Sequence, residues 1–261
     1  MENAKEFSIL HVAEEGDSTV QEMISREIPL TIILNDLELV TLLCSPKNMD
    51  YLVYGFLFAE GLVKSKNDIK ETIVDKKRGV ARVTLRDNID ADRDLLFKRL
   101  ITSACGRGAA FYSAIDAQHP AKVESGIQIS PREVSNLVQA FIQHSKVYQI
   151  THGVHSAALT DNNKIIVFND DLGRHNAIDK VFGECLLKEI PTEGRIVITT
   201  GRTPSEMILK VAKGKVPILI SIAAPTDLGI RLANDLGVTL IGNVRGPAMN
   251  IYTHGWRVVD H

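Results

Sequence analysis

The sequence has no excess of charge of either sign and no long hydrophobic run. Its 261 residues include 30 Lys and Arg and 32 Asp and Glu, which gives a net charge of −2. This balance argues against a polybasic nucleic-acid binder, so we expect no nucleic-acid partner. The longest apolar runs, 51–59 and 216–224, are much shorter than the about 20 residues that span a bilayer, so we expect no membrane span.

The N-terminal segment also lacks the basic residues of a leader. The first 24 residues contain six acidic residues and only one cation, Lys5, whereas secretory and organellar leaders are basic. Hydrophobic residues make up 44% of the chain and charged residues 24%, which is the balance of a globular chain that buries a core. We therefore expect a cytoplasmic protein of one large or two small domains.

Cysteine is scarce. Cys44, Cys105 and Cys185 form an odd and scattered set, which offers no disulfide framework and fits a reducing compartment. Cys44 ends a β-rich run, and Cys185 lies on the apolar stripe of a helical pattern, so both are predicted to be small buried side chains.

Cys105 has different surroundings. It lies in the segment TSACGRG of residues 102–108, where small residues flank it and no apolar period would bury it. The neighbouring Arg107 favours the thiolate, the form of the side chain that attacks or carries sulfur. Two interpretations stay open at this point, a reactive loop thiol and an incidental loop cysteine.

The first 101 residues predict an α+β domain. The expected elements are strands over 30–34 and 37–43, a helix over 48–60, and strands over 69–74 and 80–85. Asn35-Asp36 is a two-residue hairpin signal, Asn48 is the expected cap of the helix, and Gly61 is its expected stop. A Gly- and Ser-rich stretch then predicts a linker over 102–127, which carries Cys105.

Helices and strands alternate in the C-terminal part, which predicts an α/β sandwich with a mixed sheet over 128–261. Its first helix opens with a cap at Ser130, a proline at 131 and a capping-box acid at Glu133. The expected order is helix 131–144, strand 154–160, strand 164–169, helix 173–189, strand 195–200, helix 204–213, strand 216–221, helix 226–236 and strand 238–242.

Three of these strands end in polar loops that open helices, at 170–176, 200–206 and 224–227. Helix N-termini present free N–H groups to anions, and two of the loops also carry an arginine, Arg174 and Arg202, so a phosphate-bearing ligand would fit. The alternative is that the loops only cap helices, through Asp171, Thr203 and Thr226, and that the arginines are solvated. A fourth segment, 242–250, holds Arg245 in a Gly/Pro-rich turn and is either a cradle for a base or phosphate or a surface loop.

Several familiar signatures are absent. No phosphate-binding P-loop occurs, and Phe111 stands where the dinucleotide motif beginning at Gly106 requires glycine. The zinc-deaminase motif fails because Ala157 occupies the position of its acid, which excludes deaminase chemistry. His152 and His155 argue weakly for a metal, since a three-residue step along a strand points the two side chains to opposite faces. We therefore expect no metal site.

Five motifs occur in the order TSACG (102–106), THGVHSA (151–157), DDLGRHNA (170–177), GRTPSEM (201–207) and NIYT (250–253). Together they resemble the FdhD family, the formate dehydrogenase accessory sulfurtransferases. The resemblance covers most of the chain, and the block GRHNA of residues 173–177 is its most specific element.

The resemblance implies a cytoplasmic sulfur carrier. Such a protein takes sulfur from a cysteine desulfurase and passes it to the bis-molybdopterin guanine dinucleotide cofactor before formate dehydrogenase receives that cofactor. Cys105 would carry the persulfide. The family also implies a cytidine-deaminase-like C-terminal domain without the zinc site, and a homodimer.

The resemblance also assigns cofactor-binding residues. The family's cofactor-binding segment corresponds to Asn243, Val244, Arg245, Gly246, Pro247 and Ala248. Within it, Arg245 is the first choice for a phosphate. Arg174, His175 and Arg202 are further candidates for the phosphates of the guanine dinucleotide.

The chain departs from the family pattern at three positions. Gly108 stands where members often have a second cysteine, His152 where they usually have glycine, and Asp170 where they usually have glutamate. A relay with one cysteine is chemically sufficient, because an acceptor can attack the outer sulfur of a persulfide directly.

Three functions follow as hypotheses. The first is sulfur transfer through a persulfide on Cys105, kept anionic by Arg107. The second is a cofactor chaperone without covalent chemistry, which the missing second cysteine favours. The third is a nucleotide hydrolase that uses Asp170 and Asp171 as acid and base, and it ranks last because the sequence has no phosphate loop or metal cluster.

Overall fold

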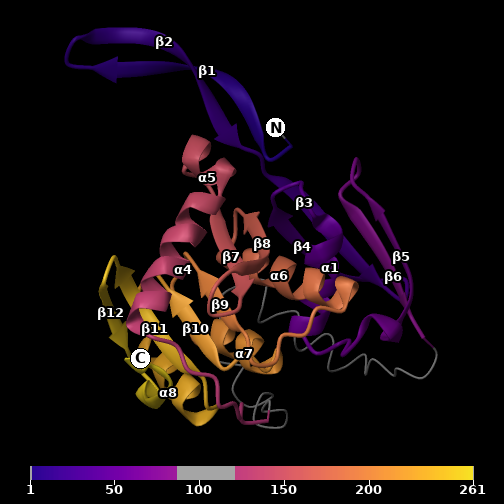
Figure 1. The fold of residues 1–261 in the computed structure, drawn as a ribbon. Coiled ribbons are helices and arrows are strands. Elements are labelled where there is room, and N and C mark those ends of the chain that lie inside the picture. Colours follow the sequence, from indigo (N-terminus) through magenta and orange to yellow (C-terminus); the bar gives the residue numbers. More distant parts are fainter. Residues whose placement is uncertain (1, 87–120, 261) are drawn as a thin grey trace.

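The computed structural model describes residues 2–86 and 121–260, which form three β-sheets and the helices packed on them (Figure 1). Cys105 and most of the predicted linker lie outside the described residues, and the domain boundaries at 101 and 128 stay predictions. The sheets have two, four and six strands, which confirms the predicted α/β class. In the two described ranges, no helix is long and apolar enough to cross a membrane.

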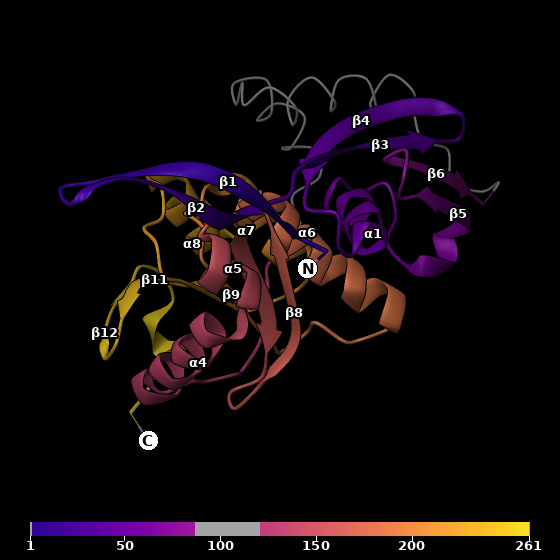
Figure 2. The same ribbon diagram turned by 90° about the horizontal axis from the view of Figure 1, so that it is seen from above.

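The chain begins with a two-stranded ribbon that the sequence pattern did not predict. Strand β1 (Ala4–Ala13) pairs antiparallel with β2 (Gly16–Ser25), and we call residues 4–25 the arm. Figures 1 and 2 show the arm extending away from the rest of the molecule. Its residues are mostly exposed on both faces, so the arm lacks the apolar-polar alternation of a half-buried strand.

The N-terminal sheet has the order β4-β3-β6-β5 and carries one long helix on its buried face. Its elements are β3 (Ile28–Leu34), β4 (Leu37–Cys44), α1 (Met49–Ala59), the 3-10 turn η1 (Lys66–Asp68), β5 (Ile69–Asp75) and β6 (Val80–Leu85). The predicted hairpin at Asn35-Asp36 and the predicted helix are confirmed, and the predicted strands over 69–74 and 80–85 pair as a second hairpin. Asn35 and Asp36 have φ angles of 46° and 64°, the left-handed geometry that a two-residue hairpin turn requires.

Asn48 occupies the predicted N-cap position of α1, but its side chain does not cap the helix. The side chain makes no capping hydrogen bond to α1, and the residue is left-handed at φ 58° instead of extended. Its Nδ2 atom donates to Oδ1 of Asn169 at 2.7 Å. A tertiary contact has therefore replaced the local capping interaction that the residue type favours.

The C-terminal sheet has the order β12-β11-β10-β9-β7-β8. Strands β9, β10 and β11 run parallel, and β7 is antiparallel to both β8 and β9, so the predicted mixed sheet is confirmed. The strands are β7 (His155–Thr160), β8 (Ile165–Asp171), β9 (Ile196–Thr199), β10 (Ile218–Ser221), β11 (Thr239–Arg245) and β12 (Ala248–Ile251). The helices are α4 (Pro131–His144), α5 (Lys146–Thr151), α6 (Arg174–Lys188), α7 (Ser205–Lys213), α8 (Asp227–Asp235) and the 3-10 turn η2 (Gly255–Arg257).

Each predicted element of this part occurs, with ends shifted by a few residues, but α5 and β12 were not predicted. The segment 242–250, expected to be a turn, is the hairpin of β11 and β12, with only a short connection around Gly246. The capping box at Ser130 is confirmed: Ser130 Oγ accepts from the amide of Glu133, and the carboxylate of Glu133 accepts from the amide of Ser130 at 2.7 Å.

Helices cover both faces of the C-terminal sheet. Helices α6, α7 and α8 pack on one face around Leu159, Val197 and Leu219. Helix α4 packs on the other face, where Phe141 lies against Ile198 and Ile220. Side chains on both faces of these short strands therefore enter apolar cores. The result is a three-layer sandwich of helices, sheet and helix.

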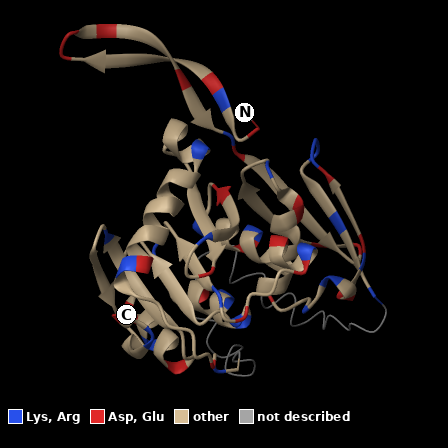
Figure 3. Cartoon of the chain, viewed as in Figure 1, with Lys and Arg blue, Asp and Glu red and all other residues tan. Residues whose placement is uncertain are grey.

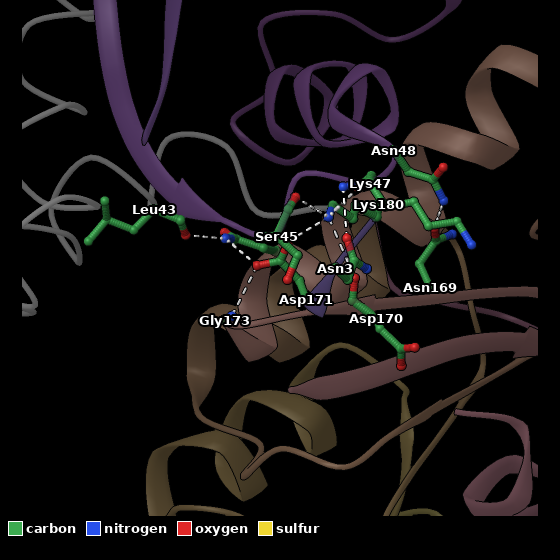
Figure 4. A network of polar contacts seen from close by, with 11 residues as sticks. Asn3, Leu43, Ser45, Lys47, Asn48, Asn169, Asp170, Asp171, Gly173 and Lys180 are labelled. Atoms are coloured by element: carbon green, nitrogen blue, oxygen red, sulfur yellow. Dashed lines mark hydrogen bonds and ion pairs between the residues drawn. The ribbon is translucent and has the colours of Figure 1, made fainter. Parts of the chain in front are cut away.

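The N-terminal sheet is joined to this sandwich through a helix pair and a polar network. Helices α1 and α6 cross so closely that a Cβ at Gly183 would lie 1.8 Å from the carbonyl oxygen of Tyr51. Beside the crossing, Lys180 and Asp171 form a fully buried ion pair at 2.5 Å (Figure 4). Lys180 also donates to the carbonyl oxygens of Ser45 and Lys47, so the β4–α1 loop is fixed to the start of α6.

Candidate functional site

The loops that the sequence predicts to bind anions lie along one edge of the C-terminal sheet. Strand β8 is parallel to β9, because both are antiparallel to β7, and β10 and β11 are parallel to β9. The loops that follow β8, β9 and β10 therefore leave the sheet at the same edge. In open α/β sheets the carboxyl ends of the strands are the usual place for a ligand.

Arg174 is the central cation of this edge. It begins α6, and its side chain packs over Gly201, where an added Cβ would lie 2.6 Å from the Cβ of Arg174. Its Nε atom is buried and has no hydrogen-bond partner within the described part of the chain. A buried donor without a partner is costly to a protein, so this atom is available to an anionic ligand.

Two histidines lie beside Arg174. The Nδ1 atom of His155 is 3.1 Å from Oγ1 of Thr200, and the same Oγ1 accepts from the amide of Ser156 at 3.0 Å. Burial first, and then the charge of Arg174, lower the pKa of His155. The spacing of the two histidines pointed to His155 only as a zinc ligand. Its place in the THGVHSA motif was the signal that marks it as a site residue.

His175 is the second of these histidines. Burial, followed by the charges of Lys210, Arg174 and His155, lowers its pKa to about 3. Glu206 lies 3.7 Å from its Nδ1 atom, a separation too long for a strong hydrogen bond, so burial and the cations prevail. The imidazole is therefore neutral near pH 7 and able to donate a hydrogen bond to a ligand.

This neutral histidine predicts a pH dependence of stability. Between about pH 3 and 6.5 His175 is protonated in the unfolded chain but not in the folded one, so stability falls as the pH drops through this window. The replacement His175→Gln is expected to reduce that slope. Urea unfolding of both proteins from pH 7 to pH 5 measures it, and an NMR titration of the His175 ring with a midpoint near 6.5 would contradict the assignment.

The other predicted loop residues have separate positions. Arg202 is exposed on the loop after β9. Thr226 caps α8 by accepting from the amide of Gly229 at 3.1 Å, so the capping alternative is confirmed there. It is wrong for Thr203, which is fully buried and whose Oγ1 lacks a partner among the described residues. The capping alternative is also wrong for Asp171, because Gly173 and not Asp171 is the residue that precedes α6. The carboxylate of Asp171 accepts from the amide of Gly173 and forms the buried ion pair with Lys180.

The segment 243–248 lies two strands further along the same sheet. Asn243 is left-handed at φ 53°, and its Nδ2 atom donates to the hydroxyl of Tyr252 at 2.9 Å. Val244 is buried in the apolar core under α4, so its side chain does not face a ligand. Arg245 and the residues through Ala248 are exposed on the β11–β12 hairpin. The structure thus brings Arg174 and His175 together and places Arg202 and 243–248 on neighbouring elements.

The described residues also surround a cavity of about 240 Å³ at the opposite end of α6. Cys185, Leu186 and Glu189 line it, together with Phe58 from α1. Helix α6 is 15 residues long, so this cavity is about 20 Å from Arg174. It is therefore separate from the sheet edge.

Two of the three thiols are buried, as predicted. Cys44 has no exposed surface and Cys185 is only 3% exposed. Burial is the main cause that raises the pKa of each thiol to about 12. Neither forms a thiolate near neutral pH, and the thiolate is the reactive form.

The burial of these two thiols predicts slow modification. In a Cys105→Ala variant, we expect the folded protein to show no rapidly reacting thiol with a disulfide reagent such as DTNB at pH 8. After unfolding in guanidinium chloride, both remaining thiols react. Rapid reaction of either thiol in the folded variant would contradict the buried environment.

No group of three or more His, Cys, Asp or Glu side chains suited to a metal ion occurs in residues 2–86 and 121–260. His152 is exposed at the end of α5 with φ 50°, and His155 begins β7. The weak metal signal of these two histidines therefore has no further ligand beside it within the described chain.

The fold and the sheet edge define a mixed α/β protein with cations and neutral histidines where a ligand would bind. The model of the FdhD/NarQ family matches residues 25–259, and the chain belongs to this family. It is 39% identical over 99% of both chains to the sulfur carrier protein FdhD of Bacillus pumilus. It is 41% identical to that of Bacillus subtilis, over 94% of both chains.

A solved structure agrees with this assignment. The crystal structure of a formate dehydrogenase accessory protein from Desulfotalea psychrophila superposes with a TM-score of 0.79 at 26% identity. The match covers 98% of this chain and 99% of that one. The family resemblance of the five motifs is therefore confirmed, whereas the likeness of the C-terminal part to cytidine deaminases stays an expectation.

Proposed function

We propose that this protein is a sulfur carrier that serves formate dehydrogenase. Family membership and the names of its relatives support this role. One observation about the chain itself carries the proposal: Cys44 and Cys185 are buried and have thiol pKa values of about 12. Cys105, with Arg107 two residues away, is therefore the cysteine left to carry sulfur.

The first step of the proposed transfer balances without an oxidant or reductant. The Cys105 thiolate attacks the outer sulfur of a persulfide on a cysteine desulfurase, and a new S–S bond forms. The S–S bond of the donor breaks, and the donor cysteine leaves as a thiolate. In the second step the acceptor supplies the electron pair for a new bond to the outer sulfur and is itself oxidised. The S–S bond on Cys105 breaks, and Cys105 leaves as a thiolate.

We propose that the acceptor is the bis-molybdopterin guanine dinucleotide cofactor, bound as a substrate at the edge of the C-terminal sheet. The unpartnered Nε atom of Arg174 and the neutral His175 suit a phosphate oxygen. Arg202 and the segment from Asn243 to Ala248 would contact other parts of this long ligand. We also propose that the protein acts in the cytoplasm and that it assembles as a homodimer.

The test is mass spectrometry of the intact protein after incubation with a cysteine desulfurase and cysteine. The parent chain should gain one sulfur that a reductant removes. Cys105→Ala should gain none and should fail to activate formate dehydrogenase, whereas the matched control Cys185→Ala should keep both properties. A gain of sulfur by Cys105→Ala would overturn the proposal.

A second candidate function is a cofactor chaperone without covalent chemistry. The observation that favours it is Gly108, which stands where the family pattern that the motifs resemble would have a second cysteine. This function predicts that Cys105→Ala still binds the cofactor and still activates formate dehydrogenase, while Arg245→Ala loses binding. The same pair of variants therefore separates the two functions.

A further inference from the structure

The arm exposes an unusual amount of apolar side chain. Phe7 is 49% exposed, Leu10 66% and Val12 69%. Ile9 and Val20 lie opposite each other in the β1–β2 pairing and form a cross-strand apolar pair. A two-stranded ribbon is marginally stable in water by itself, so an arm of this composition is expected to pack against another surface.

Hydrogen bonds hold the root of the arm, where its two strands meet the rest of the molecule, whereas its outer part projects. Asn3 and Ala4 are buried, and the Oδ1 atom of Asn3 accepts from the amide of Lys47 at 2.9 Å. On the second strand, Ser25 donates to Oγ1 of Thr151 at 2.8 Å. Beyond this root the arm leaves the body in a defined direction (Figures 1 and 2).

The arm is strongly acidic. Residues 4–25 contain five acidic residues and one lysine, which gives a net charge of −4; they are Glu6, Glu14, Glu15, Asp17, Glu22 and Lys5. Figure 3 shows acidic residues along the ribbon and at its outer turn. An apolar strand surface with this charge fits a partner surface that is basic and also carries exposed apolar side chains.

The β5–β6 hairpin is such a surface. Residues 69–86 contain six basic and two acidic residues, a net charge of +4; the basic ones are Lys70, Lys76, Lys77, Arg78, Arg82 and Arg86. Strand β5 is at the edge of its sheet, and Ile73 on this strand is 55% exposed. Lysines on an edge strand disfavour pairing with the same strand of another copy, because like charges repel. Pairing with an acidic strand is favoured, because opposite charges across a strand pair attract.

The arm does not reach this hairpin within one chain, because it extends to the left in both views of the ribbon while the hairpin lies on the right side of the molecule (Figures 1 and 2). We propose that the arm of one copy docks on the β5–β6 hairpin of a second copy of this chain. Each strand of the arm has 10 residues, a reach of about 33 Å. A two-fold axis makes the contact twice. The inference specifies the surfaces of the proposed homodimer and does not depend on the sulfur chemistry.

Two charge-reversed variants test this pairing. The arm variant is Glu14→Lys with Glu15→Lys, and the hairpin variant is Lys76→Glu with Lys77→Glu; all four positions are exposed turn residues. Each variant alone places like charges in both contacts, so its dimer dissociation constant should rise at least about tenfold. An equimolar mixture places opposite charges in both contacts, so a heterodimer should form with nearly the parent affinity.

Sedimentation velocity over a range of protein concentrations, at about 0.1 M salt, measures these states. Circular dichroism melting curves check that both variants fold, and sulfur loading of each variant separates this proposal from the proposed function. A parent chain that stays monomeric overturns the proposal. The same holds if the parent chain is monomeric and its arm binds formate dehydrogenase. A dimer insensitive to both variants, or a mixture that does not recover, overturns it as well.

Discussion

The replacement Asp171→Asn is expected to lower the free energy of unfolding by about 3–5 kcal/mol. Asp171 and Lys180 are both fully buried, so removing the carboxylate charge leaves an ammonium group in the protein interior. Lys180 keeps the carbonyl oxygens of Ser45 and Lys47, but these do not replace a charged partner. Urea unfolding monitored by circular dichroism gives the difference directly.

A matched control is available on the surface. Lys215 and Glu193 form an ion pair at a similarly short distance, 2.6 Å, but both side chains are about two-thirds exposed. Because water screens such a pair, Glu193→Gln is expected to change the free energy of unfolding by less than about 1 kcal/mol. Equal effects of Asp171→Asn and Glu193→Gln would show that burial of the Lys180 pair contributes nothing.

The network has a further consequence for the candidate site. The Oδ1 atom of Asp171 accepts from the amide of Gly173 and from Nδ2 of Asn176, and its Oδ2 atom accepts from the amide of Ser45 (Figure 4). The same carboxylate thus fixes the start of α6, which carries Arg174, to the β4–α1 loop. A role of Asp171 as a general acid or base in hydrolysis is disfavoured, because it has no exposed surface.

The second large effect is expected at the crossing of α1 and α6. A Cβ at Gly183 would lie 1.8 Å from the carbonyl oxygen of Tyr51, and a Cβ at Gly55 would lie 1.7 Å from that of Asp179. Because the opposing atoms are backbone atoms, the two helices would have to separate. We expect Gly183→Ala to lower the free energy of unfolding by about 3 kcal/mol or more, although alanine is the better helix former.

Gly126→Ala is the matched control, since no atom of the described residues lies within 4 Å of a Cβ at that position. It should be neutral or slightly stabilising. Thermal melting of the two variants beside the parent chain measures the contrast. If Gly183→Ala melts at the temperature of Gly126→Ala, the close approach of the two helices is not present in solution.

Local sequence signals predicted much of the fold correctly. Asn35-Asp36 predicted a hairpin, and the residues from Ser130 to Glu133 predicted the start of α4, because turn and capping geometry depend on neighbouring residues. Apolar periodicity placed the elements of the C-terminal sheet. The arm was missed because its strands are stabilised by pairing with each other and expose both faces, which leaves no periodic pattern.

The candidate site was predicted in part. The loops after β8 and β9 were found from their polar residues and from the rule that parallel strands end at one edge. The pattern could not show that the Nε atom of Arg174 is buried over Gly201 without a partner among the described residues. Nor could it show that His155 lies close enough to affect the pKa of His175. These facts depend on distances between residues that are far apart in the chain.

By itself, the sequence determined the α/β class, the order of most elements, the family motifs and the burial of Cys44 and Cys185. These follow from local conformational preferences and from the exclusion of apolar side chains from water. Only the tertiary structure decided that Asp171 pairs with Lys180 instead of capping a helix, that Asn48 bonds Asn169, and that the arm and the basic hairpin lie on different sides of the molecule (Figures 1 and 2). Each of these depends on packing between distant segments, for which a residue's neighbours in the sequence carry no signal.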